Sequence, residues 1–295
     1  MKKKSLLISA GTVIVVLLAT LGSFFINKQR DERVQDIKPI KVVSRSTPTY
    51  FFHGWGSSYH AEEKMVQAIR NAGITNSVIR VNVTKSGKVI LHGKFKKNAQ
   101  NPIIEVNFDD NKLSDYGNDY VRGYETAGAR YVRNAIRTVN GKYGFSKINI
   151  VAHSMGNLET AYFFKNYGNE IPVEHFVSIA GHYDGILGMN DKANQLKINS
   201  KTGKPSRMQP EYRGLLSLRK TFPRNTRVLN IYGNLENGTN SDGSVSNASS
   251  RSLRYLLNGR AKSYRELMIR GSNAQHSKLH NNNEVSQAIA NFLWK

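Results

Sequence analysis

Short apolar runs alternate with amphipathic stretches from about residue 49 to the end of the chain. Apolar runs rich in β-branched and aromatic residues are typical of strands, whereas apolar positions that recur every three or four residues are typical of helices. The runs predict strands at Thr49–Phe52, Ile103–Phe108, Lys147–Val151, His175–Ala180, Thr226–Tyr232 and Tyr264–Ile269. The amphipathic stretches predict helices over His60–Asn71, Asn118–Val139, a segment ending near Tyr167, and a C-terminal segment with Val285, Ala288, Ile289, Phe292 and Leu293.

Two further features refine this pattern. Ser86 and Gly87 separate the β-branched runs Ser77–Thr84 and Lys88–Gly93, which predicts a β-hairpin. The long helix in the middle of the chain is expected to stop at Gly141, because glycine is favoured just beyond a helix end. Strands that alternate with helices predict an α/β fold, with a mostly parallel central sheet flanked by helices. Ligands of such sheets bind at the carboxyl ends of the strands, so candidate functional residues are sought there.

The N-terminus has the pattern of a membrane anchor. An uncharged apolar run, Leu6–Ile26, follows three lysines at positions 2–4. About 20 apolar residues in a helix span a membrane, and lysines before the run favour a cytoplasmic N-terminus with the rest of the chain outside. The run is long for a signal peptide and lacks a good cleavage site, so we expect an uncleaved anchor in preference to secretion. The predicted parts are an anchor at 1–30, a polar linker at 31–47 and one domain at 48–295.

The charge balance is strongly basic, with 43 Lys and Arg against 21 Asp and Glu and a formal net charge of +22. Such a field attracts anionic ligands and surfaces. The cations are scattered, as in Arg122, Arg130, Arg133 and Arg137, which favours an anionic cell wall or lipid surface over a dedicated nucleic-acid site. The chain has no cysteine, which excludes disulfides, thiolate metal sites and a cysteine nucleophile.

A candidate nucleophile follows the strand that ends at Val151. The segment Ala152–Gly156 reads Ala-His-Ser-Met-Gly and precedes a helical stretch. A sharp strand-to-helix turn lifts a serine hydroxyl above the sheet and leaves room only for small residues two positions before and after it. The pattern is short enough to arise by chance in an ordinary turn, but the strand before it and the helix after it supply the required context. Ser154 is therefore the predicted nucleophile.

A glycine-rich segment, His53–Gly56, follows the first strand and reads His-Gly-Trp-Gly. Backbone N–H groups in such a turn can face a site, and an oxyanion needs two of them. We expect the amides of Trp55 and Met155 to act as these donors, with His53 bracing the loop. A plain glycine turn and a phosphate-binding loop are the alternatives, although the glycine patterns of phosphate loops are missing here.

A serine hydroxyl is a poor nucleophile until a base takes its proton. In sites built on this turn, an acidic residue follows the serine along the chain and the histidine comes last. His276 and His280 both follow the last predicted strand, where the base is expected, whereas His175 and His182 come too early.

Three carboxylates are candidates for the acid that orients the histidine. Asp242 lies in the loop after Tyr232, and this loop has to reach across to the histidine. Glu236 in the same loop and Asp184 after the preceding strand are the alternatives, and Asp242 is preferred.

Taken together, these motifs resemble small bacterial α/β-hydrolase lipases and esterases, and more closely the cell-surface α/β hydrolases of Gram-positive bacteria, whose substrates are unknown. The resemblance covers residues 48–295 and rests on the two glycine-containing segments, on Asp242–Val245 and on residues 276–285. It implies an α/β-hydrolase fold to which the hairpin and residues 181–225 are additions. In the small lipases the catalytic histidine opens a His-x-x-Leu segment with a valine nine residues on, which matches His276 and favours it over His280. The family's oxyanion donors map onto the amides of Trp55 and Met155.

The resemblance implies a serine hydrolase that cleaves carboxylic esters through Ser154, His276 and Asp242, without a metal or organic cofactor. Residues 181–225 are expected to cap the site. They are polar and basic and lack the apolar stripe of a lipase lid, so short or medium acyl esters with an anionic portion are favoured over lipid substrates. An amidase or peptidase with the same triad remains an alternative, as does a non-catalytic surface-binding module on this scaffold.

Overall fold

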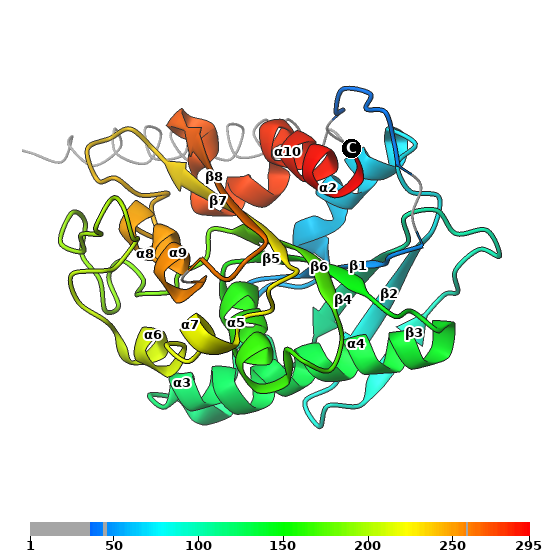
Figure 1. Ribbon diagram of the computed structural model, residues 1–295, viewed down its shortest axis with the longest axis horizontal. Helices are drawn as coiled ribbons and strands as arrows, with labels where there is room; N and C mark the ends of the chain where they lie inside the picture. The colour runs from blue at the N-terminus through cyan, green and yellow to red at the C-terminus, as the bar shows by residue number, and fades with distance from the viewer. Residues whose placement is uncertain (1–35, 44–45, 258) are drawn as a thin grey trace, which may run out of the picture. The chain divides into compact units, whose positions relative to one another are not determined.

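The computed structural model describes residues 36–43, 46–257 and 259–295, and within them eight strands form one sheet (Figure 1). The strand order is β3-β2-β4-β1-β5-β6-β7-β8, and every neighbouring pair is parallel except the hairpin β2–β3. The predicted parallel sheet and its hairpin are therefore confirmed. The strands are β1 (Thr49–Phe52), β2 (Val78–Val83), β3 (Val89–His92), β4 (Ile103–Phe108), β5 (Ile148–His153), β6 (Val173–Ile179), β7 (Arg227–Asn234) and β8 (Ser263–Arg270).

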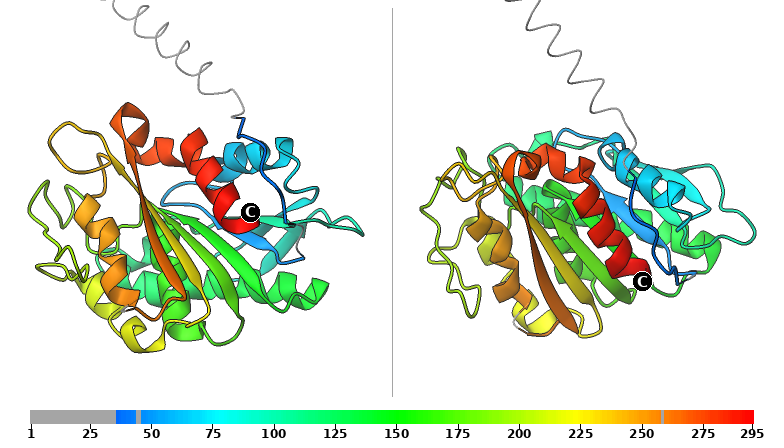
Figure 2. Two further views of the ribbon diagram at one scale, coloured as in Figure 1. Left: turned by 45° about the horizontal axis from the view of Figure 1, so that its top comes forward. Right: turned by 90° about the horizontal axis from the view of Figure 1, so that it is seen from above.

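Helices cover both faces of the sheet (Figure 2). One face packs against α2 and α10, and the other packs against α4, α5, α7 and α9. The helices are α2 (His60–Asn71), α3 (Tyr120–Gly123), α4 (Ala129–Tyr143), α5 (Met155–Tyr167), α6 (Pro210–Gly214), α7 (Leu218–Thr221), α8 (Asn247–Arg251), α9 (Leu253–Leu257) and α10 (Asn283–Trp294), with 3₁₀ turns at Ser114–Tyr116, Gly271–Ala274 and His276–Asn281 and a π-helical turn at Tyr124–Gly128.

The central strand β1 shows why this sequence forms a sheet with two covered faces. Successive side chains of a strand point to opposite faces. Phe51 accordingly packs in the core beneath α2 and α10, while Tyr50 and Phe52 pack in the core beneath α4 and α5. All three are fully buried, so β1 reads as a continuous apolar run.

The order of the strands places a crevice next to β1. The chain builds β2, β3 and β4 on one side of β1 and then crosses to β5 on its other side. Loops that leave β1 and β5 therefore diverge at the carboxyl edge of the sheet, which is where open α/β sheets bind ligands. The segments His53–Gly56 and Ala152–Gly156 both lie at this edge.

The helix expected at Asn118–Val139 is instead divided into α3, the π-helical turn and α4. The prediction that it stops at Gly141 was wrong, because α4 continues to Tyr143 and ends at Gly144, whose φ is 72°. A glycine inside a helix costs only about 1 kcal/mol relative to alanine, so it does not end a well-packed helix by itself. The short helices α6 to α9 were not predicted, since four or five residues are too few to show periodicity.

The chain before β1 contributes to the folded unit. Ile37 is buried in the core beneath α10, and the Val43 N–H donates to the Trp294 carbonyl at 2.8 Å. The apolar run at 6–26, predicted to be an anchor, lies outside the described residues. Among those residues, no helix is both long and apolar enough to cross a membrane.

One ionisable side chain in the core beneath α4 and α5 stands out. Glu159 on α5 is fully buried, and neither carboxyl oxygen has a hydrogen-bond partner among the described residues. The π-helical turn approaches it so closely that a Cβ atom at Gly128 would lie 2.6 Å from Glu159 Cγ. Burial, reinforced by the charge of Asp110, raises the pKa of Glu159 well above its ordinary value, so the fold holds this carboxyl protonated.

This protonation makes stability depend on pH. A carboxyl whose pKa is raised on folding stabilises the native state fully below its unfolded pKa, and this contribution is lost as pH rises toward the folded pKa. Glu159→Gln removes the titrating group with little change in shape. We expect the melting temperature of the variant to rise relative to wild type between pH 5 and pH 8, measured by circular dichroism. The exposed Glu236, replaced by glutamine, has no burial to relieve and is the control. An equal melting-temperature difference at both pH values for Glu159→Gln would contradict this account.

Candidate active site

Ser154 occupies a strained turn between β5 and α5. Its backbone has φ of 51° and ψ of −119°, a conformation that a residue with a side chain rarely adopts. Three hydrogen bonds hold the turn: the Ser154 N–H donates to the Ile179 carbonyl at 3.0 Å, and the Asn157 amide side chain donates to the carbonyls of Ile179 at 2.9 Å and Ser154 at 3.2 Å. The strand-turn-helix context expected for a nucleophilic serine is present.

Two glycines allow the β1 loop to approach this turn. A Cβ atom at Gly156 would lie 2.7 Å from the His53 carbonyl oxygen and 2.8 Å from that of Phe52, both within steric conflict. A Cβ atom at Gly54 would lie 2.9 Å from the Ser154 Cβ. Small residues are therefore required at both positions for β1 and β5 to bring their loops together.

A continuous hydrogen-bonded series links a hydroxyl, an imidazole and a carboxylate. His276 Nε2 lies 2.9 Å from Ser154 Oγ, and His276 Nδ1 lies 2.8 Å from Asp242 Oδ2. With its proton on Nδ1 donated to the carboxylate, the ring presents Nε2 as an acceptor for the serine hydroxyl. These residues are 122 and 34 positions apart in sequence, so only the fold brings them together.

The carboxylate is fixed from two directions. Asp242 is almost completely buried, and its Oδ1 accepts hydrogen bonds from the N–H groups of Ser244 at 2.9 Å and Val245 at 2.7 Å. The His276 N–H donates to the Asp242 carbonyl at 2.9 Å, which ties the two loops together through the backbone. This leaves Oδ2 directed at the imidazole.

Gly233 near the end of β7 is a supporting residue that sequence reasoning missed. A Cβ atom there would lie 2.9 Å from Asp242 Cβ and would overlap the Ala274 carbonyl oxygen at 2.1 Å. Its missing side chain lets the loops that carry Asp242 and His276 meet. The only feature of the sequence that could have indicated this role is its position at the start of a glycine-rich loop.

The structure places the three alternative residues elsewhere. Glu236 is exposed and pairs with Arg270 at 2.9 Å. Asp184 is buried and accepts from the Gln209 N–H at 2.7 Å, and burial raises its pKa to about 7. His280 lies in the same 3₁₀ turn as His276, but burial lowers its pKa to about 4, and its Nδ1 has no partner among the described residues. None of the three is bonded to Ser154 or His276.

The glycine-rich loop after β1 is braced by His53. The Phe108 N–H donates to His53 Nε2 at 3.0 Å, which requires the proton to sit on Nδ1, from where it is donated to the Gly54 carbonyl at 2.9 Å. The Gly56 N–H donates to the Asn111 carbonyl at 2.9 Å. The loop is therefore held on both sides of Trp55.

The two amides expected to face an oxyanion are free to do so. Met155 is the first residue of α5, so its N–H has no helical carbonyl to bind. The Trp55 N–H has no hydrogen-bond partner among the described residues. The Trp55 side chain is 62% exposed, and Lys112 Nζ lies 4.9 Å from the centre of its ring.

His153, the residue before Ser154, contacts His276. The sequence did not indicate this role. Its Nε2 lies 3.2 Å from the His276 carbonyl oxygen, to which it can donate. Its ring centre is 5.0 Å from that of His276 and 4.9 Å from that of His280. The elbow pattern allows any residue at this position, so sequence carried no signal for this role.

The segment 181–225 begins beside the same loops. The Leu187 N–H donates to the Ser244 carbonyl at 2.9 Å, and Ser246 Oγ donates to Asp191 at 2.7 Å. The ring of His182 lies 6.1 Å from that of Tyr124. This first part of the segment packs against the acid-bearing loop, while its role as a substrate cap stays a prediction. No group of side chains suited to a metal ion occurs among the described residues.

Solved structures share this fold. The lin2722 gene product of Listeria innocua is 25% identical, with a TM-score of 0.71 over 84% of this chain and 94% of its own. A candidate cell surface hydrolase from Lactobacillus plantarum is 21% identical, with a TM-score of 0.66 over 85% of this chain and 92% of its own. No curated protein sequence matches the chain significantly.

The sequence itself also matches a protein family of this fold. Residues 37–295 match the family described as alpha/beta hydrolase of unknown function (DUF915). The match begins one residue after the described part of the chain begins and includes β1 to β8 and every loop of the site. The chain therefore belongs to this family of α/β hydrolases.

Proposed function

We propose that the protein is a serine hydrolase that cleaves carboxylic esters. The observation that carries the proposal is the hydrogen-bonded series from Ser154 Oγ through His276 to Asp242, with distances of 2.9 and 2.8 Å. A nucleophile, a base and an orienting acid within hydrogen-bond reach are the parts that acyl transfer to serine requires.

The first half of the reaction forms an acyl-enzyme. Ser154 Oγ attacks the carbonyl carbon while its proton passes to His276 Nε2, and the carbonyl oxygen becomes an oxyanion facing the amides of Trp55 and Met155. Asp242 stabilises the imidazolium and keeps its ring in place. The tetrahedral species then collapses: the bond to the leaving oxygen breaks, and the proton on Nε2 moves to that oxygen and releases an alcohol.

The second half regenerates the serine. A water molecule gives one proton to His276 Nε2 and attacks the acyl carbon, and a second oxyanion forms in the same place. The bond to Ser154 Oγ breaks, the proton returns to this oxygen, and a carboxylic acid leaves. No metal or organic cofactor takes part in either half.

The surroundings of the nucleophile favour an ester with an anionic portion. Trp55, one residue from the glycine that touches Ser154, offers an exposed apolar surface, and Lys112 lies over its ring. Lys112 forms no ion pair with any described residue. Asp109 accepts a hydrogen bond from Asn82 at 2.7 Å and Asp110 accepts one from Tyr131 at 3.2 Å, and neither forms an ion pair with Lys112. An unpaired cation beside an apolar platform fits a carboxylate or phosphate near the scissile bond.

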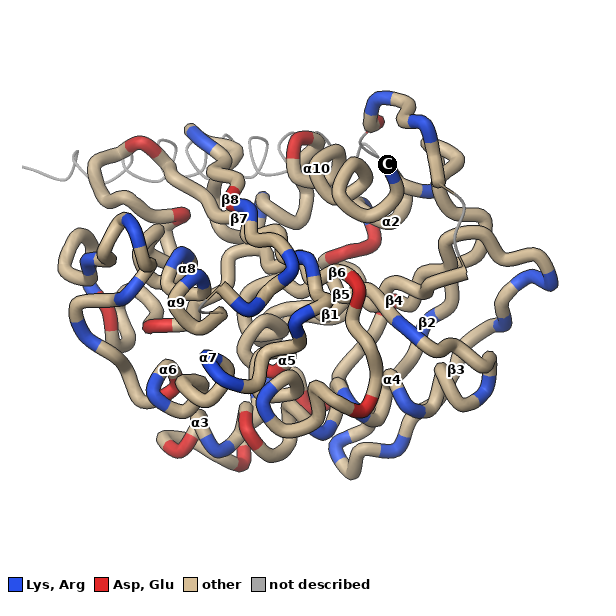
Figure 3. The backbone as a smooth tube through the Cα atoms, in the orientation of Figure 1, with Lys and Arg blue, Asp and Glu red and all other residues tan. Residues whose placement is uncertain are grey.

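We also propose an extracellular location on a membrane anchor at the N-terminus. The apolar run at 6–26 behind three lysines supports it, and so does the Lactobacillus plantarum structure, which is described as a candidate cell surface hydrolase. Figure 3 shows Lys and Arg spread over many elements of the described chain instead of gathered in one patch. This distribution favours loose adhesion to an anionic wall or lipid surface over a specific nucleic-acid site.

A fluorophosphonate probe together with a panel of p-nitrophenyl esters and matching anilides tests the reaction. Ser154→Ala should abolish labelling and lower kcat by about 10³- to 10⁶-fold, and Asp242→Asn should lower it by about 10⁴-fold, because each removes part of one charge-stabilising unit. Ester hydrolysis should exceed anilide hydrolysis at every chain length.

The control for the triad is Glu236→Gln, which alters a carboxylate of the same loop that points away from His276 and should leave kcat within about twofold. Labelling that persists in Ser154→Ala would sink the assignment of the nucleophile. Absence of both labelling and hydrolysis in the wild type would favour a surface-binding module, and faster anilide cleavage would favour an amidase.

Substrate charge is tested with 4-acetoxybenzoate and its neutral methyl ester, which differ chiefly in one negative charge. We expect Lys112→Glu to lower kcat/KM for the anionic ester by about tenfold and to change the neutral ester by less than about twofold, since a charge reversal near a bound anion costs about 1.4 kcal/mol or more. Lys142→Glu makes the same change of net charge at a lysine that lies over Tyr143 on α4, and it should affect neither ester. Equal losses on both esters would argue against recognition of the anion by Lys112.

A further inference from the structure

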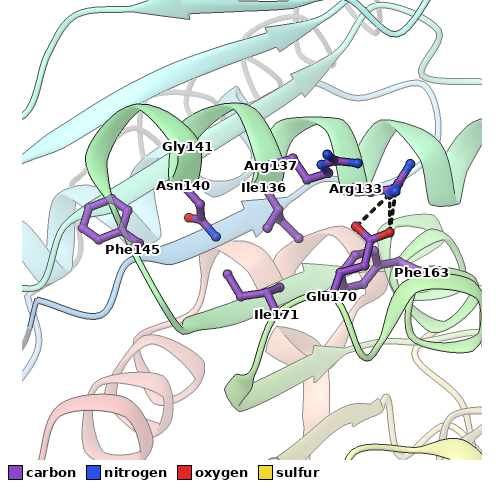
Figure 4. Close-up of a pocket in the computed structure, with 9 residues that line it drawn as sticks. All are labelled: Arg133, Ile136, Arg137, Asn140, Gly141, Phe145, Phe163, Glu170 and Ile171. Carbon is purple, nitrogen blue, oxygen red and sulfur yellow. Dashed lines mark hydrogen bonds and ion pairs between the residues drawn. The ribbon is translucent and has the colours of Figure 1, made fainter.

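A cavity lies apart from Ser154, His276 and Asp242, beside α4 and the loop between α5 and β6 (Figure 4). Its volume is about 590 Å³, which is within the usual range of small-molecule pockets, about 300–1,000 Å³. Its lining comes from α4 and Phe145 beyond its end, from Phe163 on α5, and from residues just before β6, near the amino edge of the sheet. Ser154 lies at the opposite edge, so this cavity is separate from the candidate active site.

About half of the cavity wall is apolar. Ile136 and Phe163 are buried core residues on α4 and α5, and Ile171 and Phe145 complete the apolar lining. Figure 4 shows these four side chains around a common space, with the polar side chains of α4 along one side. An apolar body of modest size fits such a lining.

The charges at the rim do not cancel. Arg133 is fully engaged, with its Nε 2.8 Å from each carboxylate oxygen of Glu170 and its guanidinium 4.5 Å from the ring centre of Tyr167. Arg137, one turn further along α4, forms no hydrogen bond or ion pair with any described residue. Its charge acts on Glu170 only at longer range. Two arginines and one glutamate leave the rim with a net charge of +1 and one uncommitted guanidinium.

A buried donor in the same lining also lacks a partner. Asn140 is only 8% exposed, and its Oδ1 accepts a hydrogen bond from the Tyr50 hydroxyl at 2.7 Å. In this orientation of the amide, Nδ2 is fully buried and has no partner among the described residues. Buried donors left unpaired cost about 1–3 kcal/mol, and this one lies in the wall of the cavity without being exposed to it.

We propose that this cavity binds an amphipathic carboxylate, with its apolar body between the Phe and Ile side chains and its carboxylate at Arg137. A guanidinium pairs a carboxylate with two parallel hydrogen bonds, which an uncharged ligand cannot match. The site is independent of the hydrolytic reaction, since none of its residues contacts Ser154, His276 or Asp242.

Calorimetric titration of the full chain carrying Ser154→Ala tests this site, with 4-phenylbutyrate as the probe and 4-phenylbutyramide as its neutral counterpart. We expect the dissociation constant of the carboxylate to be lower than that of the amide by about fivefold or more. Arg137→Gln should weaken binding of the carboxylate to the level of the amide and leave the affinity for the amide unchanged. Asn140→Asp, which places a negative charge beside the bound anion, should weaken it as well.

The matched control is Arg130→Gln, on the same helix but outside the cavity, where the arginine donates to the Ser86 carbonyl. This variant should bind both probes as the parent chain does. The proposal is overturned if neither probe binds, if carboxylate and amide bind equally, or if Arg137→Gln retains the parental affinity for the carboxylate. In the chain with an intact Ser154, Arg137→Gln should leave ester hydrolysis unchanged, so this site and the proposed reaction can fail separately.

Discussion

The strained backbone at Ser154 is the constraint on which the rest of the site depends. A residue with a side chain held at φ of 51° costs on the order of 1–3 kcal/mol, and such strain persists only where the surroundings enforce it. Here β5 and α5 hold the turn at its two ends. The Ser154 N–H donates to the Ile179 carbonyl, and the Asn157 side-chain amide donates to the same carbonyl. The same turn places Met155 at the start of α5, so one local distortion positions the hydroxyl and leaves an amide free beside it.

Asp242 and His276 reach Ser154 as a connected pair. The backbone bond from the His276 N–H to the Asp242 carbonyl joins their loops, and the absence of a side chain at Gly233 lets them approach. Because Asp242 Oδ1 is already occupied by two N–H groups, only Oδ2 is left for the imidazole. The geometry is therefore set before any substrate binds, which is the condition for electrostatic stabilisation of a transition state without reorganisation.

Much of this arrangement was predictable from sequence, and the limits have physical causes. The sheet and its hairpin follow from apolar runs of strand length, and Ser154 follows from a turn that needs small residues on both sides. Choosing His276 over His280 required a resemblance to known lipases, because both residues lie in one 3₁₀ turn and no periodicity separates them. His153 and Gly233 act through contacts between distant segments, which local patterns do not encode. The prediction that the helix ends at Gly141 was wrong because the packing of α4 stabilises the helix by more than the small free-energy cost of a glycine within it.

Burial keeps the histidines around His276 uncharged. Three other imidazoles lie near it, and burial lowers the pKa of His280 to about 4, that of His182 to about 3 and that of His153 well below its ordinary value. All three therefore stay neutral near neutral pH, and a positive charge on His276 would lower each of these pKa values further. In the proposed reaction, a positively charged neighbour would oppose the imidazolium that forms when Ser154 gives up its proton. With the neighbours neutral, Asp242 is the charge bonded directly to that imidazolium, and its attraction acts in a water-poor setting where it is strongest.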